Sequence, residues 1–108
     1  MDTNLYIIEK HNDSFRILLS GKEHPLFKAH FEGNPILPGF IFFHICENAM
    51  RHKMVEVVRA KFITFAKPND ILELHITQKE DSFHAVFERG DKKICIITYK
   101  INQREKCE

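Results

Sequence analysis

Polar and apolar residues alternate along several segments of this chain with the period of two that is typical of half-buried strands. The clearest alternation is in Ile71–Gln78, where Leu72 and Leu74 stand between polar residues. Ile94–Ile101 is more continuously apolar, as a central strand or one covered on both faces would be. These patterns predict six strands, at Leu5–Glu9, Phe15–Ser20, Val57–Ala66, Ile71–Gln78, Phe83–Glu88 and Ile94–Ile101.

Short polar segments between these runs predict tight turns between antiparallel neighbours. They are His11–Ser14, Lys79–Ser82 and Arg89–Lys92. The longer stretch Gly21–Gly39 is expected to be mostly connection.

One segment, from about Gly39 to Lys53, predicts a helix. Pro38 and Gly39 mark its beginning, although no Ser, Thr or Asp is present as a cap. The order is thus two strands, one helix and four strands. This order predicts an α+β fold in which an antiparallel sheet wraps around one central helix. Such a sheet has exposed edges, which pairing of two subunits would bury.

Size and charge narrow the possible functions. With 108 residues and 44% apolar residues, the chain is expected to form one globular domain over residues 1–108, with a frayed tail at Gln103–Glu108. The formal charge of +1, from 16 basic and 15 acidic residues, argues against a general nucleic-acid binder. No signal peptide pattern precedes residue 20, and no apolar run reaches the ~18 residues of a membrane span.

The cysteines and histidines show no metal-ligand spacing. Cys46, Cys95 and Cys107 are odd in number and unpaired in spacing, which indicates a reducing compartment such as the cytoplasm. Cys46 and Cys95 lie among apolar residues and are expected in the core, whereas Cys107 lies in the polar tail. We therefore expect neither a metal nor a cofactor. Four histidines without motif context are expected at the surface, namely His24, His52, His75 and His84.

The segment His30–Gly39 carries the candidate chemistry. It holds two Gly and two Pro in ten residues, so its backbone path is restricted. It begins with a histidine, the side chain suited to proton transfer near neutral pH, and ends at a helix N-terminus, where free N–H groups attract negative charge. A base beside a polariser of a carbonyl oxygen suits acyl-thioester chemistry. The alternative is a Pro/Gly-rich connection with a surface histidine.

The sequence H-F-x-G-x-P-x-L-P-G of this segment resembles the signature of the 3-hydroxyacyl-acyl carrier protein dehydratases of the FabA/FabZ type. Weaker similarity covers most of the chain, and Lys61–Asp70 resembles a strand and turn of that family without its second Pro and its Gly. The resemblance implies the hotdog fold and an active site shared between the two subunits of a homodimer or larger homo-oligomer. It also implies an acyl carrier protein as partner, with the substrate on its phosphopantetheine arm.

The reaction implied is loss of water from a (3R)-3-hydroxyacyl thioester. By resemblance, His30 is the base at Cα and the backbone N–H of Gly39 binds the thioester oxygen. The family's Asp or Glu lies fourteen residues after the histidine, and here that residue is His44. An imidazole can still donate a proton to a leaving hydroxyl or position it, but it has no negative charge with which to raise the basicity of His30. The resemblance places further substrate contacts at Phe31, Gly33, Pro38, Phe40, Phe43 and Asn48.

Several alternatives stay open at this point. Glu47 and Arg51 share a helical face with His44, so Glu47 could orient His44 or replace the missing acid, or the group could be the wetter stripe of a buried helix. A basic cluster of Arg51, His52, Lys53, Arg59 and Lys61 could receive an acidic carrier protein or be a solvated face. The aromatic residues near Gly39 could line an acyl tunnel or be ordinary core. The competing functions are a hotdog acyl thioesterase and a non-catalytic acyl-carrier or lipid-binding module.

Overall fold

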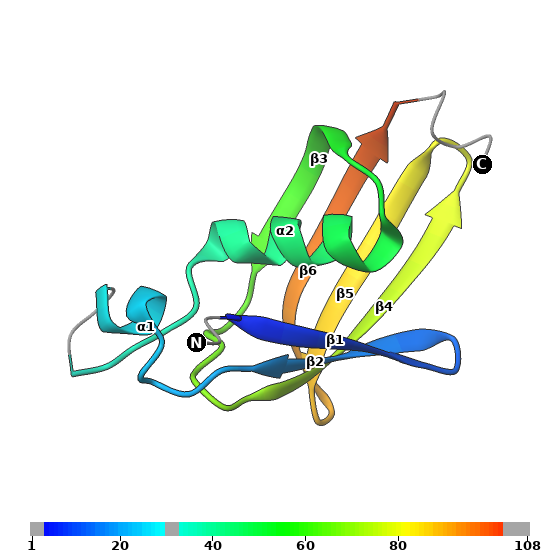
Figure 1. The fold of residues 1–108 in the computed structure, drawn as a ribbon. Helices are drawn as coiled ribbons and strands as arrows, with labels where there is room; N and C mark the ends of the chain where they lie inside the picture. Colours follow the sequence, from blue (N-terminus) through cyan, green and yellow to red (C-terminus); the bar gives the residue numbers. More distant parts are fainter. Residues whose placement is uncertain (1–3, 30–32, 103–108) are drawn as a thin grey trace.

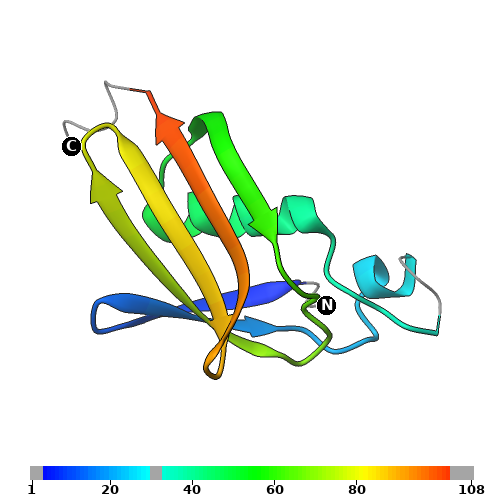
Figure 2. The ribbon, with the colours of Figure 1, turned by 180° about the vertical axis from the view of Figure 1, so that it is seen from behind.

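One antiparallel sheet of six strands and one long helix make up the fold. A computed structural model describes residues 4–29 and 33–102. Helix α2 lies across one face of the sheet (Figure 1), and the view from behind shows the opposite face without a helix (Figure 2). The elements are β1 (Tyr6–His11), β2 (Ser14–Leu19), α1 (Pro25–Ala29), α2 (Gly39–Met50), β3 (Met54–Phe62), β4 (Ile71–Lys79), β5 (Ser82–Arg89) and β6 (Lys92–Ile101).

The strand order across the sheet is β1-β2-β4-β5-β6-β3, with every neighbouring pair antiparallel. Strands β1 and β2 run in a different direction from β3, β6 and β5, so the sheet curls around α2 (Figure 1). This arrangement confirms the predicted antiparallel sheet around a central helix. The chain places β3 directly after α2, yet β3 pairs with the last strand and forms an edge of the sheet.

Three two-residue turns connect the hairpins at the predicted places. Their first residues are Asn12, Glu80 and Gly90, and all three have positive φ, of 58°, 60° and 66°. Tight hairpin turns need this left-handed backbone because it matches the twist of the flanking strands. The residues of each predicted turn segment favour this backbone conformation, and the structure shows it in all three.

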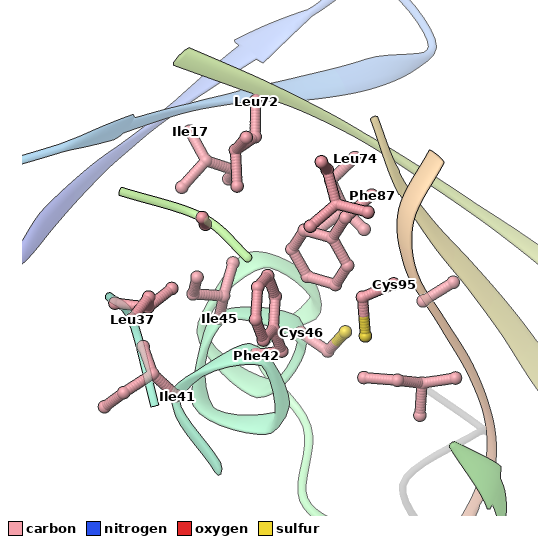
Figure 3. Packing of buried hydrophobic residues seen from close by; sticks show 14 of the residues in the cluster. Ile17, Leu37, Ile41, Phe42, Ile45, Cys46, Leu72, Leu74, Phe87 and Cys95 are labelled. Atoms are coloured by element: carbon pink, nitrogen blue, oxygen red, sulfur yellow. The ribbon is translucent and has the colours of Figure 1, made fainter. Parts of the chain in front are cut away.

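The core lies between α2 and the sheet. The helix buries Ile41, Phe42, Ile45 and Cys46. The ring centroids of Phe42 and Phe87 are 4.9 Å apart with the rings nearly perpendicular. Figure 3 shows the buried helix residues facing Leu72, Leu74, Phe87 and Cys95 from the strands. The burial of Cys46 and Cys95 confirms their predicted place in the core, while Cys107 lies outside the described residues.

Helix α2 ends at Met50, three residues before the predicted end at Lys53. Arg51 adopts the left-handed conformation with φ of 58°, and its N–H donates to the carbonyl of Glu47. The carboxylate of Glu47 then accepts the N–H of Met54 at 2.8 Å, so the chain turns at once into β3. Strand β3 consequently runs from Met54 to Phe62, earlier than the predicted Val57–Ala66.

A short helix that the sequence did not predict, α1, lies within the connecting segment Gly21–Gly39. It begins with Pro25, whose fixed φ suits the first turn of a helix. The Nδ1 atom of His24 accepts the N–H of Leu26 at 3.0 Å and caps this turn. Phe27 is buried and attaches the helix to the core.

Replacement of Ile45 by Ala tests how much the contact between helix and sheet contributes. Ile45 has no exposed surface, so the change removes buried apolar atoms and leaves a cavity. We expect the free energy of unfolding to fall by about 2–5 kcal/mol in denaturant titrations. Ile7→Ala at half-exposed Ile7 on β1 is the control and should change it by less than about 0.5 kcal/mol. Equal effects of the two changes would contradict a core centred on α2.

Candidate active site

Gly39 begins α2 beside the aromatic ring of Phe62. Pro38 precedes it with extended backbone, at φ of −63° and ψ of 145°, and no side chain caps the helix. A Cβ atom added to Gly39 would lie 3.2 Å from Cζ of Phe62, which is closer than side-chain carbons normally approach. The absence of a side chain therefore lets Phe62 cover the helix N-terminus. First-turn N–H groups have no acceptor within their own helix and are suited to bind a developing oxyanion.

An apolar cavity of about 360 Å³ opens at this helix N-terminus. Its walls come from two segments of the chain, the residues leading into α2 and the end of β3 with the loop that follows. The lining residues are Ile36, Leu37, Pro38, Gly39, Phe42, Phe62, Thr64 and Phe65. A mostly apolar cavity with one helix N-terminus in its wall could hold an acyl chain and polarise the carbonyl group at its end.

His44 lies on the exposed face of α2. Its ring meets the ring of Phe40 edge to face, with the centroids 5.9 Å apart, and Phe40 is itself half exposed. His44 does not line the apolar cavity of the single chain. His30 and Phe31 lie outside the described residues, so the structure does not place the predicted base or its neighbour. Of the two predicted catalytic residues that the structure describes, Gly39 lines the cavity and His44 does not.

The predicted substrate contacts separate into different places. Pro38 lines the apolar cavity, and half-buried Phe43 packs against Phe62 with ring centroids 6.3 Å apart. Gly33, with φ of 85°, lines a different cavity together with Lys22 and Lys28. Asn48 lies near the other end of α2, where its amide donates to the hydroxyl of Tyr6 on β1.

Glu47 connects the end of α2 to the start of β3. Besides accepting the N–H of Met54, it lines a cavity of about 250 Å³ with Asn48, Arg51, His52 and Lys53. This cavity lies at the C-terminal end of α2, whereas Gly39 is at the N-terminal end. Three residues of the predicted basic cluster, Arg51, His52 and Lys53, therefore share a cavity with Glu47.

Sequence reasoning was wrong about His52, which we expected at the surface. Its ring is half buried and lies edge to face against both Phe83 and Tyr99, and its Nε2 atom is 2.8 Å from the hydroxyl of Tyr99. Burial raises the pKa of Tyr99 above its usual value. His24 is also half buried, whereas His75 and His84 are exposed as predicted. No local pattern indicates the His52–Tyr99 contact, because the two residues are 47 positions apart.

The two buried thiols are not candidate nucleophiles. Burial raises the pKa of Cys95 to about 12, and burial together with the nearby Cys95 and Glu47 raises that of Cys46 further. Both therefore stay protonated near neutral pH. Within residues 4–29 and 33–102, no group of three or more His, Cys, Asp or Glu side chains is arranged to hold a metal ion. In the same part of the chain, no helix is long and apolar enough to cross a membrane.

Comparison with known proteins finds a matching family model and similar solved structures. The ApeI-like family model, described as ApeI dehydratase, matches residues 7–98. A similar solved structure is the dehydratase heterocomplex ApeI:P from Xenorhabdus doucetiae, with a TM-score of 0.73 and 18% identity over 95% of this chain and 100% of that chain. An uncharacterized protein from Erwinia carotovora subsp. atroseptica has a TM-score of 0.59 and 19% identity over 91% and 94%. No curated protein matches the sequence significantly.

These findings confirm the predicted hotdog fold and the resemblance to hotdog dehydratases. At identities below 20%, the two solved structures support the fold alone. The family model supports dehydratase chemistry, because it covers most of the chain, including Gly33–Gly39 and α2.

A double-mutant cycle tests the close approach of Phe62 to Gly39. Gly39→Ala should lower the free energy of unfolding by about 1 kcal/mol, because the added Cβ crowds the Phe62 ring. In a Phe62→Ala background the same change should cost less than about 0.5 kcal/mol, since the crowded ring is gone. Denaturant unfolding of the four proteins measures both values. An identical cost in the two backgrounds would show that Phe62 does not cover the helix start.

Proposed function

The chain belongs to the ApeI-like family of dehydratases, and from this premise we propose that it dehydrates (3R)-3-hydroxyacyl thioesters carried on an acyl carrier protein. The product is a trans-2-enoyl thioester, in fatty acid or specialised lipid or polyene biosynthesis. The observation that carries the proposal is the apolar cavity whose wall includes the first residue of α2. A carrier-bound acyl chain needs such a cavity, and its thioester oxygen needs a donor at the end of it.

In the proposed mechanism the base is His30. It removes the proton from Cα, and negative charge develops on the thioester oxygen, where the N–H of Gly39 and the positive end of α2 stabilise it. The electron pair then forms the Cα=Cβ bond while the C–O bond to the hydroxyl breaks. His44 supplies a proton to the departing hydroxyl or positions it, so that water leaves.

In the part of one chain that the structure describes, the side chains around the proposed site are open to solvent. Phe40, Phe62 and Phe65 are half exposed or more at the helix start and the cavity, and His44 is exposed beside them. Electrostatic stabilisation of an oxyanion is stronger when water is excluded. Within the described residues these side chains have no cover, so the proposed site calls for one.

We propose that a second copy of the chain supplies this cover through β3. The strand is a sheet edge of nine residues, and it exposes Val55, Val57 and Val58 together with the adjoining Ile63. A long apolar edge in water favours pairing with another strand. The other edge, β1, is shorter and exposes one large apolar side chain, Ile7, beside Glu9, Lys10 and His11.

Charge along β3 supports a two-fold antiparallel pairing. Glu56 lies in the first half of the strand, and Arg59 and Lys61 lie in the second half. Antiparallel pairing with an identical strand brings the acidic half of each copy against the basic half of the other. A different hotdog subunit is the alternative partner, since the similar protein from Xenorhabdus doucetiae is described as a heterocomplex.

We also propose the acyl carrier protein as the partner that delivers substrate. The exposed basic side chains of Arg51 and Lys53 adjoin the end of α2, and Arg59 and Lys61 lie on exposed β3. Their positive charges suit an acidic partner. The free thiols of Cys46 and Cys95 support a reducing compartment, and we propose the cytoplasm.

A non-catalytic acyl-binding module is the second candidate function. The observation that favours it is that an exposed histidine, His44, stands at the position of the family's carboxylic acid. Incubation with a 3-hydroxyacyl carrier substrate followed by mass spectrometry separates the candidates. Loss of water supports the dehydratase, free acid supports a thioesterase, and unchanged substrate supports the binding module.

Substitution of the two histidines tests the division of labour in the proposed mechanism. His30→Ala should lower the dehydration rate by ~10²–10⁴-fold, because it removes the base. His44→Ala should also impair turnover strongly, whereas His44→Glu should retain or raise activity because it restores the family's acid. Steady-state dehydration of a 3-hydroxyacyl thioester measures these rates, with circular dichroism to confirm folding.

The matched control is His75→Ala, which removes another exposed histidine, on β4, and should leave the rate unchanged. The proposed role of His44 would be wrong if folded His44→Ala matched the parent while Glu47→Ala was inactive.

A charge on β3 should break the proposed assembly. The parent should sediment as a dimer at micromolar concentration, and Val58→Lys should sediment as a monomer with reduced dehydration, because it places an unpaired charge in the pairing edge. Ile7→Lys adds the same charge at the opposite edge and should remain a dimer. A monomeric parent, or a dimer lost only in the Ile7 variant, would contradict pairing through β3.

A further inference from the structure

The loop between β3 and β4, residues 63–70, forms one wall of the apolar cavity through Thr64 and Phe65. Little of this loop is held by burial. About half of Ile63 and more than half of Phe65 are exposed, while Ala66 is buried. The position of this loop in the cavity wall therefore depends mainly on hydrogen bonds.

Backbone hydrogen bonds fix the two ends of the loop. At its start, the N–H groups of Ile63 and Thr64 donate to the carbonyl of Ile94 at 2.8 and 3.3 Å. Ile94 is the residue that an irregularity between β5 and β6 leaves out of their register. At the loop's end, the Asp70 carbonyl accepts the N–H of Leu19 at 3.0 Å, and Asn69 donates to the Ser20 carbonyl at 2.8 Å.

The middle of the loop depends on a side chain from another strand, Arg89 at the end of β5. Its guanidinium donates to the backbone carbonyl of Phe65 at 3.0 Å and to the carboxylate of Asp70 at 2.6 Å. The same carboxylate accepts the N–H of Lys67 at 2.8 Å. Arg89 thus joins the cavity-lining residue Phe65 to the fixed end of the loop, and we refer to Arg89, the Phe65 carbonyl and the Asp70 carboxylate as the Arg89 clamp.

The loop in turn holds the other wall of the cavity. The carbonyl of Ala66, next to Phe65, accepts the N–H of Leu37 at 2.8 Å. Leu37 lies two residues before Gly39, the first residue of α2. The Arg89 clamp, Ala66 and Leu37 form a continuous connection from β5 to the helix start.

From this connection we infer that Arg89 is a positioning residue for the dehydratase reaction. The Arg89 clamp sets the separation of the two cavity walls, and with it the position of a long acyl chain relative to the Gly39 N–H. This inference rests on the proposed function for its catalytic consequence, while the structural connection can be measured separately. Displacement of a reacting group by about 1 Å is enough to cost ~10²-fold in rate.

The structural arm of the test is amide hydrogen exchange of the assembled protein, followed residue by residue by NMR. Arg89→Ala should raise the exchange rate of the Leu37 N–H by about tenfold or more, because the carbonyl that it bonds to is no longer held in place. The matched control is Arg16→Ala. It removes the ion pair with Glu73, at 3.6 Å, from a partly exposed position on the same sheet and should leave Leu37 unchanged.

The catalytic arm compares kcat/KM for long-chain and short-chain 3-hydroxyacyl thioesters. A long chain occupies the wall at Phe65, so Arg89→Ala should lower kcat/KM for it about tenfold and for the short chain less. General destabilisation would lower both equally. If Arg89→Ala fails to fold, Asp70→Asn removes the charged acceptor at constant size and should shift both readouts in the same direction.

The two arms distinguish failure of this inference from failure of the proposed function. A parent protein that dehydrates neither substrate would contradict the proposed function, and the exchange of Leu37 would still decide whether Arg89 holds the cavity. Unchanged Leu37 exchange in the Arg89 variant would overturn the clamp. Altered exchange with an unchanged ratio of the two kcat/KM values in an active enzyme would overturn its role in positioning substrate.

Discussion

The burial of one face of α2 against the sheet determines where the candidate functional groups Gly39, Phe40 and His44 lie. Ile41, Phe42, Ile45 and Cys46 form that face, and their packing fixes the rotation of the helix about its axis. The residues Phe40 and His44, which are one turn apart, must then lie together on the exposed side. Because the helix cannot roll without exposing its apolar face, the position of Gly39 at the cavity is fixed by the core.

The path of the chain through the sheet joins this helix to an open edge. Strand β3 follows α2 directly, and Glu47 links the two by accepting the first N–H of the strand. Among the strands of the described residues, β3 pairs only with β6, so its other side remains an edge. Two irregularities leave Val55 and Val58 out of the register with β6. Bulges and charged side chains are two of the ways in which native proteins protect an edge from pairing. Here the residues left out are exposed valines, so a partner that follows the bent strand would gain apolar burial.

Local sequence patterns were enough to predict the elements whose residues face the core at regular intervals. Alternation identified β4, and the turn residues placed the hairpins where positive φ is now seen, as at Asn12. The end of α2 was missed because Arg51, a good helix former, adopts a left-handed conformation there. Helix α1 was missed because its cap is the ring of His24, which is not a usual capping residue. The motif placed Gly39 at the start of the helix, where α2 begins. Contacts such as Arg89 with Phe65 join residues 24 positions apart and leave no local pattern.

The end of β3 shows why the candidate site and the assembly edge are difficult to separate. Phe62 ends the strand, covers Gly39 at the helix start and packs its ring near those of Phe42 and Phe43. Half of its surface is nevertheless exposed, on the edge where β3 lacks a neighbour. A partner strand that covers this surface must restrict the Phe62 ring, because the ring already contacts the helix on its other side. A partner strand that covers the β3 edge therefore also covers the cavity, because the Phe62 ring belongs to both.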